Sequence, residues 1–321
     1  MKQLSGYQRF EILRKAADIM RSRIQDLGTT VSTEEGKILA EGLAEADRAI
    51  QTIELSGEEA KRLYGETVPL DGASNWAGQY GFTMRVPVGV VAAIAPFNFP
   101  LNLVAHKVGP ALAAGNAVII KPATDTPLSA LKLTEVLIEA GAPPEAVQCI
   151  TGSGSRLGDP LVADSRVRKV TFTGSRDVGE TICKTAGLKK VTMELGSNSP
   201  LIVMPDANMD KVIAGTVSSG FSNAGQVCIS AQRVMASKDI YGDFVDALTE
   251  AVRGLTTGSQ LDSSVKMGPM VRAEDAVRVN DWIKEAVGSG ARATTGGEYE
   301  GALHEPTVVA DVTPDLSLIH I

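Results

Sequence analysis

The stretch of this chain best suited to nucleophilic chemistry is 222–230, which holds Cys228 among small and polar residues. It shows neither the spacing of an apolar helix face nor the alternation of a strand, so it predicts a loop or turn at Gly225. Loops held by a rigid scaffold are where catalytic side chains concentrate. A free cysteine is more commonly a small buried hydrophobic residue, so this stretch alone leaves both interpretations open.

Four further stretches place polar groups at the ends of predicted strands. They are residues 94–100, 120–124, 172–175 and 193–196. In a parallel sheet covered by helices, ligands bind at the carboxyl ends of the strands. The sequence therefore predicts that an amide, an ammonium, a hydroxyl and a carboxylate meet at one edge of a sheet, supplied by Asn98, Lys121, Ser175 and Glu194.

The elements that would position these groups alternate between short apolar strands and helices from residue 90 onward. Such βαβ units predict an α/β fold, with a doubly wound parallel sheet and helices on both of its faces. A β-hairpin is predicted over 65–88, and a capping pattern at 32–35 predicts the start of a helix. The predicted strands are 90–95, 117–120, 147–150, 169–173, 191–195, 201–204 and 233–237, and the predicted helices are 7–26, 33–57, 101–114, 126–140, 155–163, 178–186, 210–221, 241–254 and 273–288.

Composition limits the class of protein. With 321 residues, 44 % of them hydrophobic and 21 % charged, the chain is typical of a globular protein with two or three domains. Its net charge of −7 argues against nucleic acid as a partner. We also expect no membrane span and no secretory signal, because no long apolar run is present. Three cysteines and three histidines, without metal-ligand spacing, predict a cytoplasmic protein that has no metal site.

Taken in chain order, five motifs resemble those of the aldehyde dehydrogenase superfamily, and the resemblance covers about residues 7–315. The motifs are Pro-Phe-Asn-Phe-Pro at 96–100, Lys-Pro-Ala at 121–123, Phe-Thr-Gly-Ser at 172–175, Glu-Leu-Gly at 194–196 and Gly-Gln-Val-Cys at 225–228. The resemblance implies an NAD(P)-binding domain over 1–196, in which 65–88 serves oligomerisation, and a catalytic domain over 197–321. It also implies a homodimer or homotetramer.

The resemblance implies catalytic roles for three residues. Cys228 would be the nucleophile that attacks an aldehyde carbon to form a thiohemiacetal. Asn98 would donate its side-chain N–H to the developing oxyanion, together with the backbone N–H of Cys228. Glu194 would be the general base for thioester hydrolysis, and its place at the end of an apolar strand predicts a raised pKa. We expect Cys149 and Cys183 to be buried and unreactive.

The resemblance further implies a site for NAD or NADP. Lys121 would bind the adenosine ribose, and the turn at 174–179 would hold the pyrophosphate at a helix N-terminus. Many NAD-preferring relatives carry glutamate where this chain has Thr124, so the neutral hydroxyl predicts that NADP⁺ is accepted. Lys107 aligns with a lysine of the family's proton-relay region. The implied cofactor residues are Phe97, Lys121, Thr124, Gly174, Ser175 and Gly179, and His106 would line the path of the substrate.

The chain departs from the family pattern at its two ends. It begins after the strands that usually precede the first long helix. Residues 316–321 stand where the family has Glu-x-Phe-Gly-Pro, whose glutamate holds the nicotinamide ribose. We therefore expect a chain truncated at both ends, with an incomplete catalytic domain and little dehydrogenase activity.

The predicted reaction is oxidation of an aldehyde to a carboxylic acid by NAD(P)⁺, and three alternatives stay open. A CoA-acylating enzyme is disfavoured by Glu194, because such members often lack this base. A cysteine hydrolase needs a histidine partner, and of the three histidines only His106 falls in a motif region. An inactive nucleotide-binding fragment is the third alternative. The sequence does not name the aldehyde.

Overall fold

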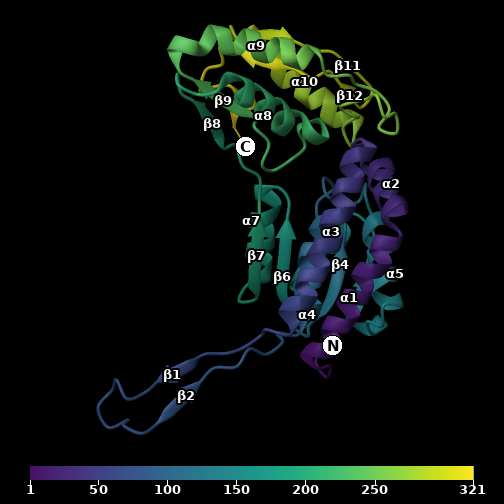
Figure 1. Cartoon of the computed structure of the whole chain (residues 1–321), viewed down its shortest axis with the longest axis vertical. Coiled ribbons are helices and arrows are strands. Elements are labelled where there is room, and N and C mark those ends of the chain that lie inside the picture. Colours follow the sequence, from purple (N-terminus) through teal and green to yellow (C-terminus); the bar gives the residue numbers. More distant parts are fainter. Residues whose placement is uncertain (321) are drawn as a thin grey trace.

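The computed structural model describes residues 1–320 and contains two α/β units, with a hairpin projecting from the larger one (Figure 1). Ile321, the last residue of the predicted catalytic domain and of the 316–321 tail, lies outside the described residues. The larger unit is built on a parallel sheet in the order β5-β4-β3-β6-β7, as a doubly wound fold requires. Its strands are β3 (Val90–Ile94), β4 (Ala117–Lys121), β5 (Val147–Cys149), β6 (Val167–Thr173) and β7 (Lys190–Glu194).

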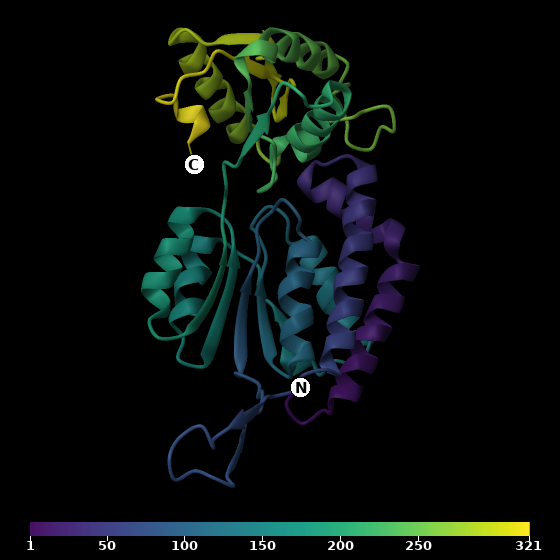
Figure 2. The same ribbon diagram turned by 60° about the vertical axis from the view of Figure 1, so that its left-hand side comes forward.

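Both faces of this sheet are buried, because alternate residues of β3 enter two separate cores. Val91 and Ala93 pack in a core shared with the N-terminal helices, α4 and α5. Ala92 and Ile94 pack on the opposite face with α6 and α7. A continuous apolar run is what a strand covered on both faces needs. Figure 2 shows the sheet between these two helical layers. The helices named are α4 (Asn102–Ala113), α5 (Leu128–Glu139), α6 (Gly154–Ala163) and α7 (Arg176–Ala186).

The N-terminal region forms three helices where two were predicted. They are α1 (Gly6–Ser22), α2 (Ile24–Glu35) and α3 (Leu39–Ala60). The predicted helix start at 32–35 is wrong, since Ser32 is a fully buried residue inside α2. Gly36 ends α2 with a φ of 104°, and its amide donates to the carbonyl oxygen of Ser32 at 3.0 Å. Glycine adopts this left-handed conformation at little cost, so Gly36 breaks an otherwise continuous helical pattern.

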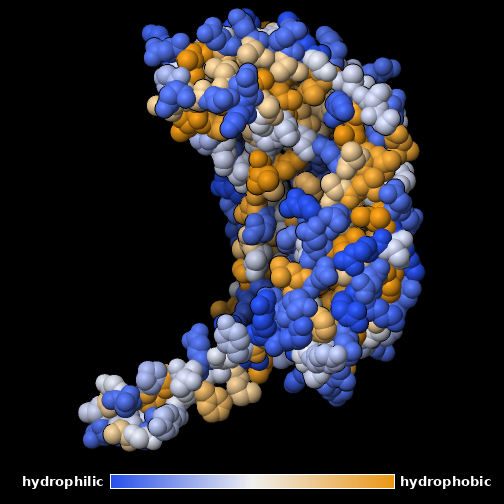
Figure 3. All heavy atoms as spheres, viewed as in Figure 1, coloured by the Kyte–Doolittle hydropathy of each residue, from blue (hydrophilic) through white to orange (hydrophobic). Residues whose placement is uncertain are grey.

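The predicted hairpin is present over β1 (Thr67–Pro69) and β2 (Tyr80–Phe82), which pair antiparallel. Figure 3 shows it standing clear of the body of the molecule. Its apolar side chains face solvent: Tyr80 is 89 % exposed and Phe82 is 75 % exposed. The arm therefore presents apolar surface with no covering from the rest of this chain.

The smaller unit begins after the link that follows Glu194, where the proposed domain division near residue 196 falls. β8 (Pro200–Val203) pairs in parallel with β9 (Arg233–Ala236), and α8 (Met209–Phe221) connects them. Val203 packs against Phe244 and other apolar residues of α9 (Tyr241–Arg253) in a core of its own.

A further helix and several short strands complete the smaller unit. They are α10 (Ala273–Gly288), β10 (Arg292–Thr295), β11 (Tyr299–Glu300), β12 (Leu303–His304) and β13 (Val308–Ala310). The last four strands were not predicted, because strands of two to four residues give no readable alternation. Among the helices within residues 1–320, none is both long and apolar enough to span a membrane.

Candidate active site

The carboxyl ends of β3, β4, β6 and β7 bring the predicted polar groups to one edge of the sheet. Asn98 follows β3, Lys121 ends β4, Ser175 follows β6 and Glu194 ends β7. The chain leaves β3 toward β4 on one side and later returns to β6 on the other, so β3 lies at the point where the strand order reverses. Such a switch point opens a crevice between neighbouring loops, where ligands bind.

Cys228 lies just beyond the turn η2 (Ser222–Gly225), as the sequence predicted for a loop at this position. Its side chain is exposed. Asn223, Ala224 and Gly225 have left-handed φ angles of 51°, 53° and 76°. This conformation costs a non-glycine residue roughly 1–2 kcal/mol, so contacts elsewhere must hold the turn.

Two groups hold the turn. The Glu41 carboxylate on α3 accepts hydrogen bonds from the Ser222 hydroxyl at 2.7 Å and from the Asn223 amide at 3.1 Å. On the far side, the Ser197 hydroxyl donates to the carbonyl oxygen of Cys228 at 2.7 Å. The cysteine loop is thus fixed both by the larger unit and by the link between the units.

Asn98 lies against the cysteine loop, because its side-chain Nδ2 donates to the carbonyl oxygen of Gln226 at 2.8 Å. An amide nitrogen carries two hydrogens, which leaves one for another acceptor. Within residues 1–320 the backbone N–H of Cys228 donates to no described acceptor. The Asn98 loop and the Cys228 loop therefore offer one donor each, from the two sources that the oxyanion prediction named.

Glu194 lies opposite Thr173 in the β6–β7 pairing, and its side chain is exposed. The expected apolar surroundings of this carboxylate are therefore wrong: β7 lies at the sheet edge and is mostly exposed along its length. Lys107 is buried nearby, and its Nζ donates to the Thr173 hydroxyl at 2.7 Å. Burial lowers the pKa of Lys107 to about 8, and the nearby Glu194 carboxylate opposes that shift. A lysine with such a pKa exchanges protons near neutrality.

The other two cysteines differ from expectation. Cys149 is half-buried, and burial raises the pKa of its thiol to about 11. Cys183 is exposed on α7, so the prediction that it is buried is wrong. Its helix covers the sheet with Gly179, Ile182 and Ala186, and Cys183 falls on the outer side of that stripe.

The predicted cofactor residues fit a dinucleotide in their chemistry and position. Lys121 is buried, its Nζ donates to the Pro122 carbonyl at 2.9 Å, and burial lowers its pKa. Thr124 is exposed three residues further on. Asp125 forms an ion pair with Arg272 of the smaller unit, which leaves the Thr124 hydroxyl as the neutral group at this turn.

The start of α7 fits a pyrophosphate. Ser175 is its N-cap, and the Ser175 side chain makes no capping hydrogen bond, so the first amides of the helix are free for an anion. Gly179 packs on the end of β7: a Cβ there would lie 2.8 Å from Leu195 Cδ2. Gly174 directly precedes the N-cap. The helix can therefore approach the sheet closely at the point where the phosphates would lie.

Phe97 is half-buried in the loop between β3 and α4, and His106 is exposed on α4. Burial lowers the pKa of His106, and the positive charges of Arg48 and Lys107 act in the same direction. The positive charge beside His106 therefore comes from Arg48 of α3 and from Lys107 of α4.

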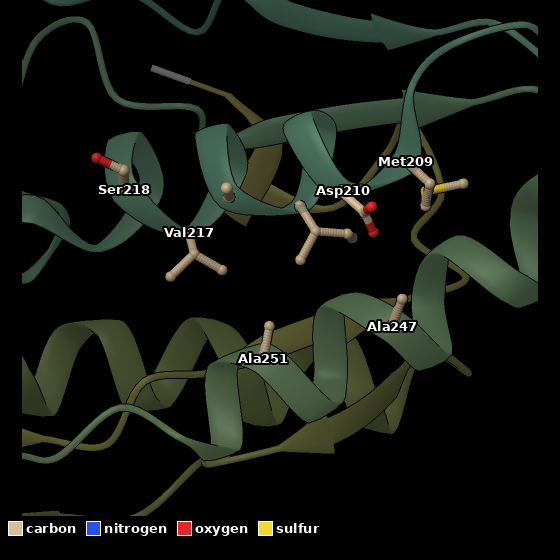
Figure 4. Close-up of a pocket in the computed structure, with 8 residues that line it drawn as sticks. Met209, Asp210, Val217, Ser218, Ala247 and Ala251 are labelled. Carbon is tan, nitrogen blue, oxygen red and sulfur yellow. The ribbon is translucent and has the colours of Figure 1, made fainter.

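A groove of about 500 Å³ lies elsewhere, between α8 and α9. Figure 4 shows Val217 and Ala251 facing each other across it, with Met209, Asp210, Ser218 and Ala247 along its sides. None of the predicted site residues lines this groove. We place the candidate site at the sheet edge, because the polar and titratable groups that follow β3, β4, β6 and β7 converge there.

Sequence reasoning missed the buried charged residues behind the site. Glu35, Lys37 and Glu45 are each 1 % exposed, although helical spacing places charged residues on an outer face. The one signal that could have found them is Gly36, which turns the chain between two of these residues. Asn223 and Gln226 were seen only as polar members of the cysteine loop.

Comparisons with known proteins identify the family of this chain. The model of the aldehyde dehydrogenase family matches residues 1–320. The chain is 47 % identical to a 3-sulfolactaldehyde dehydrogenase of Priestia aryabhattai, over 98 % of this chain and 66 % of that protein. It is 39 % identical to an NADP(+) succinate-semialdehyde dehydrogenase of Escherichia coli, over 96 % of this chain and 64 % of that protein.

Among solved structures, aldehyde dehydrogenase 21 from Physcomitrella patens, in complex with the reaction product succinate, superimposes with a TM-score of 0.96 at 36 % identity. The match covers 100 % of this chain and 67 % of that one. The chain thus spans about two thirds of the length of the relatives it matches. The predicted α/β fold and family are confirmed, and this chain belongs to the aldehyde dehydrogenase family.

Proposed function

We propose that this protein oxidises an aldehyde to a carboxylic acid with NAD(P)⁺, using Cys228 as the nucleophile. The observation that supports this best is the hydrogen bond from Asn98 to the loop of Cys228, at 2.8 Å. This contact joins the loop of Asn98 to the loop of Cys228, and an aldehyde would need both a donor for its oxygen and a nucleophile for its carbon.

In the proposed mechanism the Cys228 thiolate attacks the aldehyde carbon. The oxyanion that forms accepts hydrogen bonds from the free N–H of Asn98 and the backbone N–H of Cys228, and each such donor contributes about 3–4 kcal/mol. NAD(P)⁺ would supply the hydride acceptor, so that loss of hydride from the thiohemiacetal would leave a thioester on the Cys228 sulfur. Glu194 then takes a proton from the water that hydrolyses the thioester, and its exposure gives that water access. Lys107 lies within electrostatic reach of Glu194 and can exchange protons with it.

The proposed cofactor site uses Lys121 and Thr124 for the adenosine ribose and the start of α7 for the pyrophosphate, with Phe97 beside the nicotinamide. Gly174 and Gly179 permit the start of α7 to approach the sheet closely. We propose that NADP⁺ is accepted, because the group three residues after Lys121 is neutral. The Escherichia coli relative carries NADP(+) in its name, which supports the same choice.

We propose a small anionic aldehyde as the substrate. The relatives named above act on sulfolactaldehyde and succinate semialdehyde, both of which carry an anionic group. In this chain Arg48 and Lys107 place positive charge around His106 on the α4 face. A neutral histidine can donate one hydrogen bond to such an anion, while Arg48 supplies the permanent charge.

The hydrolase alternative lacks support. His304 is buried in the smaller unit, where its Nδ1 lies 2.8 Å from the Glu305 carbonyl oxygen. His106 and His320 make no described hydrogen bond to Cys228.

We also propose a homodimer or homotetramer, with the 65–88 arm as the contact. We propose a cytoplasmic location, since all three cysteines are unpaired.

The test of the function is peptide mass mapping after incubation with NADP⁺ and succinate semialdehyde or propionaldehyde. A thioester on Cys228 requires both thiol attack and hydride loss, so it reports the chemistry even where turnover is slow. We expect acylation of Cys228 with the anionic aldehyde only, and none in Cys228→Ser, while Cys183→Ser retains it. Acyl-CoA formed on addition of CoA would favour the CoA-acylating alternative, and acylation without NADP⁺ would contradict the proposal.

A further inference from the structure

Three charged side chains are buried behind the two loops of the candidate site. Glu35 ends α2, Lys37 lies in the link that follows, and Glu45 lies on α3. Each is 1 % exposed, which is rare for such residues unless they are paired and hydrogen-bonded. Lys37 and Glu45 form an ion pair of 2.8 Å.

Glu35 contacts the cysteine loop directly. Its Oε1 accepts a hydrogen bond from Asn223 Nδ2 at 2.8 Å, and its Oε2 accepts one from the Lys37 amide at 3.0 Å. Asn223 carries a left-handed φ of 51° and is 3 % exposed. A residue held in that conformation by a charged acceptor is released when the acceptor weakens.

Lys37 and Glu45 contact the other loop. Lys37 Nζ donates to the carbonyl oxygen of Asn98 at 2.5 Å and lies 4.0 Å from the ring centroid of Phe99. Glu45 Oε1 accepts from the amides of Leu101 and Asn102 at 2.9 and 3.0 Å, at the start of α4.

The two sets of contacts meet at one atom. The carbonyl oxygen of Asn98 also accepts from Asn223 Nδ2, at 3.3 Å. The nucleophile loop and the oxyanion-donor loop are therefore tied to each other through groups that touch neither substrate nor cofactor.

We propose that Glu35, Lys37 and Glu45 form a positioning cluster that sets the placement of the Cys228 loop against the Asn98 loop, with Glu35 as its pH-sensitive member. The cluster rests on the proposed function only for its catalytic consequence. Its structural content, that a carboxylate on α2 holds residues 222–226, stands whatever reaction the site performs.

The charge balance explains the pH sensitivity. Lys37 and Glu45 face Glu35 from the link and from α3, and Glu41 on α3 faces Asn223 from its other side. Burial raises the pKa of Glu35 to about 7, Lys37 and the Asn223 hydrogen bond oppose the shift, and Glu45 adds to it. A protonated carboxyl accepts well at one oxygen only, so below this pKa one of its two hydrogen bonds weakens.

Asn223 can adapt to that proton. Its Oδ1 is buried and accepts no hydrogen bond within the described residues. Rotation of the amide would let Oδ1 accept the new O–H of Glu35, and Nδ2 would then leave both Glu35 and the Asn98 carbonyl. Protonation thus replaces one set of hydrogen bonds among Glu35, Asn223 and the Asn98 carbonyl by another.

The test is hydrogen exchange of the chain without substrate or cofactor, in Glu35→Gln and in a matched control, Glu34→Gln. Glu34 precedes Glu35 on the same helix, and burial raises its pKa as well. It accepts instead from the Leu128 and Ser129 amides of α5, at 2.7 and 3.0 Å. We expect Glu35→Gln to lower protection of 222–230 by roughly tenfold, the loss of one hydrogen bond to a charged acceptor. Glu34→Gln should lower protection at 127–131 only.

A pH series separates positioning from general destabilisation. In the wild type, protection of 222–230, corrected for intrinsic exchange, should fall between about pH 8 and pH 6, while Glu35→Gln stays flat. The wild-type series needs no variant, so it decides the matter even if Glu35→Gln fails to fold. A flat wild-type series, or equal loss of protection at 222–230 in Glu34→Gln, would overturn the proposal. Neither readout needs dehydrogenase activity, so failure of the proposed function is seen separately, in the absence of acyl-Cys228.

Discussion

At the scale of single residues, the three cysteines differ in what surrounds the sulfur. We expect iodoacetamide to label Cys228 and Cys183, which are exposed, and to spare Cys149, whose thiol pKa is about 11. A thiol pKa raised from 9.0 to about 11 reduces the thiolate fraction roughly a hundredfold. Bound NADP⁺ with an aldehyde should then slow labelling of Cys228 alone, and mass mapping measures this. Protection of Cys183 to the same degree would contradict the assignment of Cys228 as the nucleophile.

The cofactor prediction depends on one exposed hydroxyl. Thr124→Glu adds a carboxylate where the 2′-phosphate would lie, so the apparent affinity for NADP⁺ should fall at least about tenfold through like-charge repulsion. Affinity for NAD⁺ should change little. Fluorescence titration with each dinucleotide measures both values, and Thr29→Glu, on an exposed face of α2, is the control for added charge. If Thr124→Glu binds NADP⁺ as tightly as the wild type does, this residue does not decide cofactor choice.

Glu35 makes stability depend on pH. Its pKa is raised to about 7 in the folded protein from an ordinary value of 4.5, so between these pH values the folded state binds more protons than the unfolded state. Stability must then fall as pH rises through this window and level off above it, by on the order of 3 kcal/mol for this group. Urea unfolding at about pH 4.5 and 7.5 should show a decrease in the wild type that exceeds that of Glu35→Gln by this amount. The same decrease in both proteins would rule out Glu35 as the source.

The functional residues that can be identified from the sequence are those that lie within a recognisable local motif. Asn98 lies in the loop after β3, Lys121 ends β4 next to Pro122, and Cys228 lies in the loop after the turn at Gly225. Glu35 and Lys37 lie in a segment that reads as an ordinary charged helix. Their burial follows from how three helices pack with the sheet, which no local pattern records.

At the scale of elements, the turn before the nucleophile is strained. Ala224 has a φ of 53°, which costs an alanine roughly 1–2 kcal/mol. Ala224→Gly removes that cost but adds about 0.4–1 kcal/mol of unfolded-chain entropy. We expect a net gain in stability of about 0.5–1 kcal/mol, seen as a higher urea midpoint. Ala247→Gly, inside α9, is the matched control and should lower stability by about 1 kcal/mol. A loss of stability in Ala224→Gly would show that the turn is relaxed.

Most long elements begin and end close to their predicted bounds, because apolar periodicity and glycine caps define them. The break between α2 and α3 was missed, since one glycine interrupts a pattern that continues on both sides. The strands β10 to β13 are too short to show an alternation of their own and are held by pairing, β10 with β13 and β11 with β12. Local patterns predict an element only where local forces decide it.

At the scale of the whole molecule, the projecting arm is expected to join subunits. Met84 and Val86 are both 71 % exposed, and with Tyr80 and Phe82 they leave an apolar surface that is costly in water. Replacing residues 67–82 by a short Gly-Ser linker should convert an oligomer to a monomer, measured by light scattering on a sizing column. Retention of the wild-type mass would place the contact on another face. The arm packs on neither core, so the truncated chain should keep its fold.

The junction at the Asn98 carbonyl also has a consequence in time. It joins residues 61 and 125 positions apart, and the Glu35–Asn223 contact spans 188 positions. Contacts so distant along the chain form late, after the entropy of closing long loops has been overcome. During synthesis from the N-terminus, the helices and the sheet of the larger unit are complete before Asn223 is made. The newborn protein therefore passes through a stage in which the scaffold is closed and the reactive thiol has yet to reach its place. Until then the larger unit can fold without the hydrogen bond between Asn223 and Glu35, which ties the Cys228 loop to α2.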